Sequence, residues 1–161
     1  MSQARSAWNA QHRAGAIVAE VDFHTGVADK LGYTCRLLRK AWRAGNQVVV
    51  TGAPDELSRL DRLLWTFDLG DFIPHARLRA GEAPPERLVR TPIWLADAPA
   101  EARPRDVLVN LGPAVVADHA RFARVIEIVA EPPDEVASGR HRWRHYLAAG
   151  LTPNNHAQRT G

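Results

Sequence analysis

The strongest constraint on the fold is the alternation of short apolar runs with amphipathic segments between residues 17 and 68. Residues 17–24 (IVAEVDFH) and 47–51 (QVVVT) are rich in β-branched side chains and predict two strands. Residues 29–43 and 54–68 carry apolar side chains at intervals of three and four, which predicts a helix after each strand. Strands that alternate with helices form parallel sheets with right-handed crossovers, so this half of the chain predicts an α/β fold.

The second half of the chain continues the alternation with shorter segments. Residues 106–111 (DVLVNL) and 124–130 (RVIEIVA) predict two more buried strands, and residues 91–95 (TPIWL) predict a third. Residues 133–148 predict a closing helix, because a proline opens this segment and a glycine follows it. The remaining segments are predicted as an extended piece, a loop, a linker and a helical turn, at residues 72–75, 76–90, 96–104 and 119–122.

Length and composition indicate one globular domain. The chain has 161 residues, of which 45% are apolar and 24% charged, close to the average for globular proteins. We expect the domain to span residues 17–150, between a flexible N-terminal extension (residues 1–16) and a polar C-terminal tail (residues 151–161). The expected architecture is a single-domain, Rossmann-like α/β fold with a mostly parallel sheet flanked by helices.

Charge and cysteine content narrow the class of protein further. The chain has 21 basic and 18 acidic side chains, so its net charge of +3 permits an acidic partner without demanding one. A single cysteine, Cys35, excludes an internal disulfide and a Cys-rich zinc module, and it fits a reducing compartment. No run approaches the ~18 apolar residues of a membrane span, and the N-terminus lacks the apolar core of a secretory signal. We therefore expect a cytoplasmic protein that does not associate with membranes.

The turn after the second predicted strand lies where a nucleotide-binding loop would lie. Residues 47–57 contain one glycine, Gly52, and no Gly-Lys-Ser/Thr sequence. A phosphate cradle needs several glycines, so that backbone N–H groups converge, together with the lysine. The segment is therefore predicted to be an ordinary strand-to-helix turn, and no cofactor is expected.

Catalytic and metal-binding patterns are weak. His141 and His145 share one face of the last helix, but the arginines between them oppose a dication, so no metal site is expected. Cys35 falls on an apolar helical stripe, which is typical of a buried structural thiol. Asp22 and His24 share one face of the first strand and are the nearest approach to a general acid/base pair. No catalytic residue is assigned, and the chain is predicted not to be an enzyme.

The last helix carries the most unusual composition. Residues 139–146 (GRHRWRHY) combine three arginines, two histidines and two aromatic residues. An apolar stripe at Val136, Trp143 and Leu147 is interrupted by Arg140. Either the Arg140 side chain extends to solvent, or it lies beside an apolar groove, where its guanidinium would bind the carboxylate of a peptide. Direct binding of single-stranded nucleic acid through this basic helix is the alternative function, because arginine and aromatic side chains also suit single strands.

Several segments together resemble the chi subunit of bacterial DNA polymerase III. Residues 60–75 (LDRLLWTFDLGDFIPH) are similar to the family's stretch of Leu-Asp, Leu-Trp, Phe and Pro-His, and residues 37–50 resemble the helix and strand before it. Residues 106–111 and 122–130 follow in the family's order, and residues 140–150 (RHRWRHYLAAG) resemble its C-terminal helix. The resemblance extends over residues 17–153.

The resemblance implies a non-catalytic adaptor in DNA replication. Members of this family have a Rossmann-like sheet without a nucleotide site and belong to the clamp-loader assembly of the replicative polymerase. They bind the acidic C-terminal tail of the single-stranded-DNA-binding protein, and they reach the loader through the psi subunit. The expected partners are therefore that tail and psi, or another clamp-loader component, with indirect contact to single-stranded DNA.

The resemblance also implies which residues bind the tail. On the last helix these are Arg140, which would pair with the terminal carboxylate, and Trp143, where the family usually has Tyr. Trp65 and Phe72 match aromatic residues of the family's pocket, and Val129 matches a residue at the end of the last strand. A member of the family has Lys where Val136 stands here, so this chain has one cation fewer beside the expected site.

Overall fold

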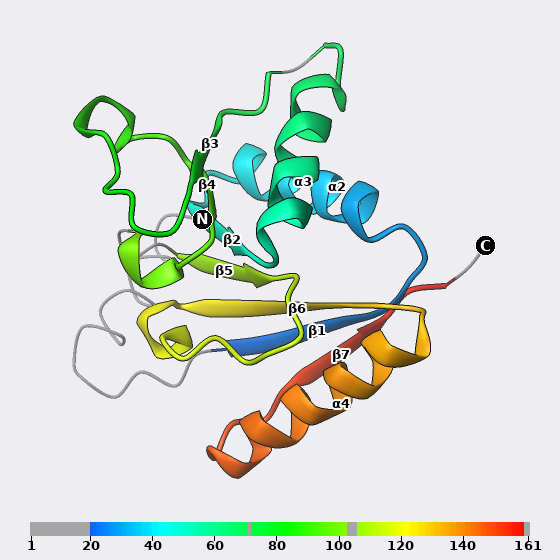
Figure 1. The fold of residues 1–161 in the computed structure, drawn as a ribbon. Coiled ribbons are helices and arrows are strands. Elements are labelled where there is room, and N and C mark those ends of the chain that lie inside the picture. Colours follow the sequence, from blue (N-terminus) through cyan, green and yellow to red (C-terminus); the bar gives the residue numbers. More distant parts are fainter. Residues whose placement is uncertain (1–19, 71, 103–105, 160–161) are drawn as a thin grey trace.

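The computed structural model describes residues 20–70, 72–102 and 106–159 (Figure 1). The N-terminal extension expected at residues 1–16 lies outside the described residues. Within them, seven strands form a single sheet in which every neighbouring pair is parallel, so the predicted α/β class is confirmed. Their order is β3-β4-β2-β5-β6-β1-β7. The strands are β1 (Glu20–Val27), β2 (Val48–Thr51), β3 (His75–Leu78), β4 (Ile93–Ala96), β5 (Val107–Asn110), β6 (Arg124–Ala130) and β7 (Asn154–Ala157).

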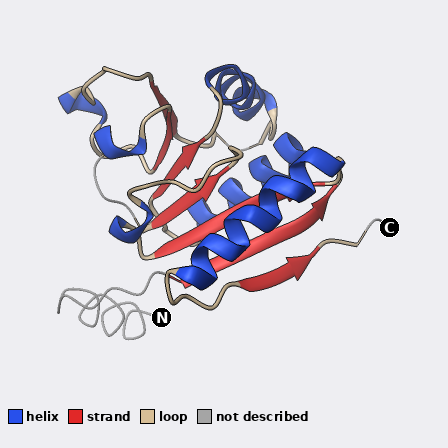
Figure 2. Ribbon diagram, turned by 60° about the horizontal axis from the view of Figure 1, so that its bottom comes forward, coloured by secondary structure: helices blue, strands red, loops and turns tan. Residues whose placement is uncertain are grey.

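Three helices cover the two faces of the sheet. They are α2 (Lys30–Arg43), α3 (Pro54–Thr66) and α4 (Pro133–Ala148). Figures 1 and 2 show α2 and α3 on one face and α4 alone on the other, along β6, β1 and β7. Alternate residues of the inner strands point to opposite faces, so β6 contributes Ile126 and Ile128 to the α2–α3 side and Val125 and Val129 to the α4 side.

Local sequence accounts for where the helices begin. Asp29 caps α2, its side chain accepting a hydrogen bond from the backbone N–H of Gly32 at 3.1 Å. Pro54 occupies the first turn of α3, where a backbone N–H would lack a partner within the helix. Apolar side chains at intervals of three and four then bury one face of each helix, including Cys35, which is fully buried as predicted. Burial raises the pKa of the Cys35 thiol to about 11, so the group is an unreactive core side chain.

The two edge strands differ from the prediction. Residues 76–78 were expected in a loop and instead complete β3, whose register follows β4. Residues 154–157 were expected in a polar tail and instead form β7, all of whose side chains are exposed. Such a strand carries no apolar alternation, so its sequence gives no strand signal. It forms a strand because its backbone pairs with the edge of β1 that β6 leaves free.

Three short 3₁₀ turns complete the description. They lie at η1 (Glu86–Leu88), η2 (Pro99–Glu101) and η3 (His119–Arg121). The last of these confirms the helical turn predicted before β6. Along the chain, the connection after β2 leads toward β3 and the connection after β5 leads toward β6, in opposite directions across the sheet. The carboxyl ends of β2 and β5 therefore form the topological switch point, where α/β proteins usually bind ligands.

Candidate functional site

Helix α4 lies unusually close to β6. A Cβ atom at Gly139 would lie 2.9 Å from one γ-carbon of Val129 and 3.0 Å from the other, which is closer than packed carbons approach. Glycine at this position therefore permits the contact. Val129 is 3% exposed and lies beneath the helix, so it sets the position of α4 and offers little of its own surface.

A buried polar network fixes the helix to the sheet. Glu127, in the middle of β6, is fully buried and accepts hydrogen bonds from Arg142 Nε at 2.8 Å and from the Tyr146 hydroxyl at 2.6 Å. Asn110 Nδ2 at the end of β5 donates to the same carboxylate at 2.9 Å. Burial raises the pKa of Glu127, while the Arg142 guanidinium and these hydrogen bonds oppose that rise. The paired charges hold α4 in a fixed rotation and leave its other flank to solvent.

This network corrects the expected orientation of the last helix. The residues of α4 that are fully buried are Gly139, Arg142 and Tyr146, so the arginine on the packing face is Arg142 and Arg140 is exposed. The apolar stripe seen in the sequence is displaced to the flank of the helix. There Trp143 is half-buried, with its ring edge-to-face against Phe23 of β1 at 5.0 Å between centroids. The sequence did contain a signal for this arrangement, since a glutamate inside the apolar strand RVIEIVA is buried and a buried carboxylate needs a cation beside it.

The α4 surface, defined by Arg140, Trp143 and the underlying Val129, is one of two candidate interaction surfaces. Arg140 forms no ion pair with any other residue that the structure describes, and it lies one turn from the half-buried Trp143. Leu147, 49% exposed, extends the apolar flank one turn further. An exposed cation beside an aromatic ring and an aliphatic side chain is the combination enriched where proteins bind peptides.

The aromatic surface, defined by Trp65 and Phe72, is the second. Trp65 is 58% exposed and Phe72 is 60% exposed, and their ring centroids lie 5.3 Å apart. The Trp65 ring also packs against the buried His75 ring, tilted by 59°, with 4.9 Å between the centroids. The His75 ring is hydrogen-bonded through Nδ1 to the carbonyl of residue 73 at 2.7 Å, and its Nε2 lies 3.0 Å from a carboxylate oxygen of Asp61. Buried polar contacts thus support an exposed apolar surface that nothing else in the described chain covers.

The five residues predicted for one tail site fall into two groups. Trp65, in the last turn of α3, and Phe72, after that helix, lie together at the β3 edge and on the α2–α3 side of the sheet. Val129, Arg140 and Trp143 lie together on the α4 side, over β6 and β1 (Figures 1 and 2). The sheet separates the two groups, so one short peptide does not contact both.

The topological switch point contains an open cavity of about 440 Å³. Thr51 and Gly52 line it after β2, Asn110 and Gly112 line it after β5, and alanine, proline and valine side chains make up most of the rest. The first turn of α3 carries Asp55 and Glu56, which oppose a phosphate group at that helix terminus. The nearby cation, Lys30, already binds the carbonyl of residue 111 at 2.6 Å and two glutamates. This chemistry disfavours a nucleotide.

Both members of the acid/base candidate on the first strand, Asp22 and His24, make hydrogen bonds that serve the fold. Asp22 is buried and accepts hydrogen bonds from Arg124 Nε at 2.8 Å and from His156 Nε2 at 3.0 Å, and His24 is bonded to the Tyr33 hydroxyl. Across the described residues, no three histidine, cysteine or acidic side chains gather in a way that could hold a metal ion. None of the helices in the described part of the chain is both long and apolar enough to cross a bilayer.

Comparison with solved structures defines the class of fold. The C-terminal domain of the DEAD-box protein Dbp5 superposes with a TM-score of 0.60 at 11% identity, over 88% of this chain and 91% of that one. A structure of Dbp5 from S. cerevisiae in complex with other proteins superposes with a TM-score of 0.61 at 9% identity, over 87% of this chain and 42% of that one. At these identities the likeness shows the fold alone, an α/β domain with a parallel sheet flanked by helices.

Sequence comparison defines the family. Residues 18–154 match the family described as DNA polymerase III chi subunit, HolC. DNA polymerase III subunit chi of Pseudomonas aeruginosa is 33% identical over 79% of this chain and 85% of that protein. The Escherichia coli subunit of the same name is 26% identical over 74% of this chain and 80% of that protein. The chain therefore belongs to the chi-subunit family of DNA polymerase III, accessory subunits of a replicative polymerase, and the predicted resemblance is confirmed.

Proposed function

We propose that this protein is a non-catalytic adaptor that binds the acidic C-terminal tail of the single-stranded-DNA-binding protein on its α4 surface. The observation that carries the proposal is Arg140, an exposed cation without an ion-pair partner among the described residues, held one turn from Trp143. The buried Glu127–Arg142 pair fixes the helix that presents both side chains. The site is thereby preorganised, which lowers the entropy cost of binding a flexible peptide.

The chemistry of the proposed peptide matches this surface. A tail that ends in acidic residues, apolar side chains and a free carboxylate offers an anion for Arg140 and an apolar group for Trp143. Arginine binds a carboxylate through two parallel N–H donors, which gives orientation as well as affinity. The apolar end would lie on the flank formed by Trp143 and Leu147, both partly exposed. Val129 acts from beneath by setting the position of the helix.

The aromatic surface serves a second partner in this proposal. Trp65 and Phe72 lie on the side of the sheet opposite to the α4 surface, so occupation of one surface leaves the other free. We assign them to psi or another clamp-loader component, because exposed tryptophan and phenylalanine are typical anchors of protein interfaces. The protein would then connect the loader to template coated with the single-stranded-DNA-binding protein. Such a role places it in the bacterial cytoplasm, with the chromosome.

The test is a titration of the protein into a fluorescent peptide that copies the C-terminus of the same organism's single-stranded-DNA-binding protein. Anisotropy should rise with the intact peptide and not with a peptide that lacks the terminal apolar residue. Arg140→Ala should weaken binding by at least about 2 kcal/mol, or about 30-fold, because the peptide carboxylate loses its charged partner. Trp143→Ala should weaken it through loss of apolar contact.

The matched control is Arg59→Ala. Arg59 is an exposed arginine on α3, so its replacement removes the same charge from the other side of the sheet. This variant should bind the peptide as tightly as the parent protein. Equal losses in the Arg59 and Arg140 variants would mean that net charge, and not a site on α4, governs binding. Unchanged affinity in the Arg140 variant would remove the assignment.

A further inference from the structure

The outward face of α2 is strongly basic. The helix contains five basic residues and no acidic one, and four of them, Arg36, Arg39, Lys40 and Arg43, follow the three- and four-residue spacing of a single face. Arg39 and Arg43 both contact Asp68, at 2.9 and 3.8 Å. Arg36 and Lys40 are exposed, and neither forms an ion pair with another residue that the structure describes. Their charges therefore face solvent.

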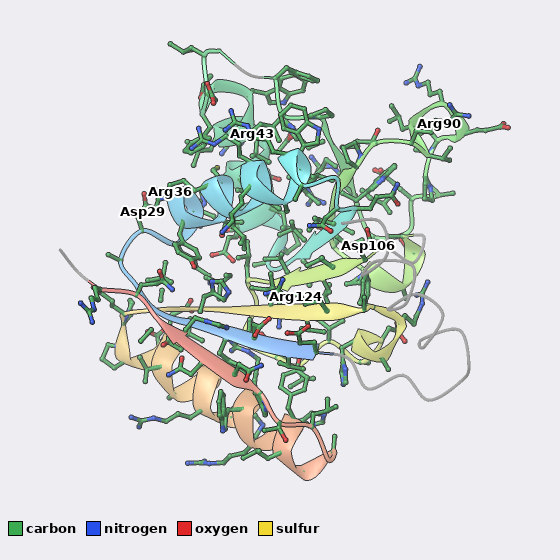
Figure 3. All side chains as sticks on the ribbon, turned by 180° about the vertical axis from the view of Figure 1, so that it is seen from behind. Asp29, Arg36, Arg43, Arg90, Asp106 and Arg124 are labelled. Atoms are coloured by element: carbon green, nitrogen blue, oxygen red, sulfur yellow. The ribbon has the colours of Figure 1, made fainter. Side chains whose placement is uncertain are left out.

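A row of three rings continues from this helix across the edge of the sheet. The hydroxyl of Tyr33, one turn before Arg36, forms a hydrogen bond with Nδ1 of His24 on β1, and their ring centroids lie 5.6 Å apart. His24 in turn lies 5.2 Å from His156 of β7, and the His156 side chain is 50% exposed. Parallel pairing places His24 and His156 opposite each other, so both point to the α2 side. The row spans α2, β1 and β7, which Figure 3 shows from behind together with the labelled Arg36 and Arg124.

Positive charge borders the row on each side. The Arg36 guanidinium lies 5.9 Å from the centroid of the Tyr33 ring. The pKa of His24 is lowered, first by burial and also by neighbouring cations that include Lys40 and Arg124. The Asp22 carboxylate is 3% exposed, while the Arg124 side chain bound to it is 45% exposed. Two exposed carboxylates lie at the margins of this region, Asp29 at the start of α2, labelled beside Arg36 in Figure 3, and Glu20, which pairs in register with Arg124. Solvent therefore meets Arg36, Lys40 and Arg124 together with the rings, while the carboxylate between them, that of Asp22, lies beneath.

We propose that this edge surface, defined by Tyr33, His24, His156 and the cations Arg36, Lys40 and Arg124, binds single-stranded nucleic acid. Cations spaced along a surface suit the phosphates of an extended strand, and rings between them suit unpaired bases, which every sequence offers. An acidic peptide would use the cations but not the rings. The surface lies on the other side of the sheet from α4, so it is separate from the proposed tail site and from the basic face of the last helix. A protein bound to the tail would thereby reach the DNA next to it.

The experiment measures anisotropy of a labelled oligothymidylate of about 16 nucleotides, a length within the range that one domain covers. Three phosphate contacts predict a slope of about −2 for the logarithm of affinity against that of salt concentration. Affinity should therefore fall about twentyfold between about 50 and about 200 mM salt. The double variant Arg36→Ala/Lys40→Ala should bind at least about tenfold more weakly at the lower salt, and its affinity should fall only about threefold over that range.

Two variants of His156 separate stacking from fold stability. His156→Ala removes a ring and the bond to Asp22, and it should weaken binding about fivefold or more, since that is the smallest effect expected for one stacked base. His156→Phe also removes the bond but keeps a ring, and it should restore most of the affinity. Equal losses in both variants would show that the ring does not stack on a base, and this would overturn the proposed binding mode.

Matched double variants locate the site. Arg59→Ala/Arg62→Ala, on the exposed face of α3, removes two charges elsewhere and should leave oligonucleotide affinity unchanged. Arg140→Ala/Arg144→Ala should abolish peptide binding and spare the oligonucleotide. Loss of oligonucleotide binding in that variant alone would place nucleic acid on α4 and overturn the proposal. Loss of peptide binding in Arg36→Ala/Lys40→Ala, with oligonucleotide binding unchanged, would assign the edge surface to an acidic protein segment and overturn it as well.

Discussion

Removal of the buried arginine of α4 tests the central packing argument. Arg142 and Glu127 are 1% and 0% exposed and are joined at 2.8 Å, so Arg142→Met leaves a carboxylate in the core with only neutral hydrogen-bond donors. Breaking such a pair costs about 3–5 kcal/mol. Since a domain of this kind has a free energy of unfolding of about 5–15 kcal/mol, the variant should remain folded but lose a large share of its stability.

Urea unfolding followed by circular dichroism gives the free energy of unfolding directly. The double variant Glu127→Met/Arg142→Met is the control, because it removes both charges and replaces them with apolar atoms. It should recover most of the loss, since exchanging a whole buried pair for apolar side chains is often nearly neutral. If the double variant lost at least as much stability as Arg142→Met, the two residues would not interact. A loss below about 1 kcal/mol in Arg142→Met would show that Glu127 is not confined to the core.

The same variant has a defined pH dependence. Burial raises the pKa of Glu127 in the folded protein, and without Arg142 that pKa rises further. A folded-state pKa above the unfolded value means that the folded protein binds the proton more tightly, so stability increases as pH falls toward the unfolded pKa. The loss in free energy of unfolding of Arg142→Met relative to the parent should therefore become smaller as the pH falls from 7 toward the ordinary pKa of a glutamate. A deficit that does not change with pH would contradict this account.

The remaining predictions concern the surfaces and the sheet edge. Trp65→Ala should leave the free energy of unfolding within about 0.5 kcal/mol of the parent. In a binding titration it should weaken the affinity for the proposed clamp-loader partner by about 2 kcal/mol or more. Gly139→Ala should destabilise the protein by about 1–3 kcal/mol through its clash with Val129, and Val129→Ala in the same chain should relieve it. Burial alone would raise the pKa of Asp22, but hydrogen bonds from His156 and Arg124 bring it below its ordinary value. The stability from these bonds is therefore present above the unfolded pKa of Asp22 and is lost as the pH falls through its folded pKa. His156→Ala should make the free energy of unfolding depend less on pH in this acid range, as followed by circular dichroism.

The central strands and the helices were predictable because their signals are local. The valine run at residues 48–50 and the isoleucine-valine pattern of β6 are buried on both faces, which a sequence of consecutive apolar residues reports. The bounds of α4, Pro133–Ala148, agree with the prediction because proline and glycine mark its ends within the sequence itself. The edge strand β7 was missed because asparagine and histidine side chains in solvent carry no periodicity.

The rotation of α4 could not be obtained in the same way. Its sequence offers an apolar stripe through Val136, Trp143 and Leu147, and that stripe was expected to pack on the sheet. In the structure the packing face instead contains Gly139, Arg142 and Tyr146, because a glutamate in β6 requires the arginine and the tyrosine, and β6 requires a residue without a side chain. The choice between Arg140 and Arg142, two residues apart, was therefore made by a residue in another element.

The sequence by itself determined the class of fold, the order of its main elements and the family, since these depend on periodicity, on turn residues and on the order of motifs along the chain. The tertiary structure decided which arginine is buried, that the predicted site residues occupy two sides of the sheet, and that rings from α2, β1 and β7 form one row. These features depend on contacts between residues distant in sequence, as when Asp22 meets His156 across 134 positions. Hydrophobic patterning specifies which face of an element is buried, but which residues of other elements contact that face is decided only when the chain folds.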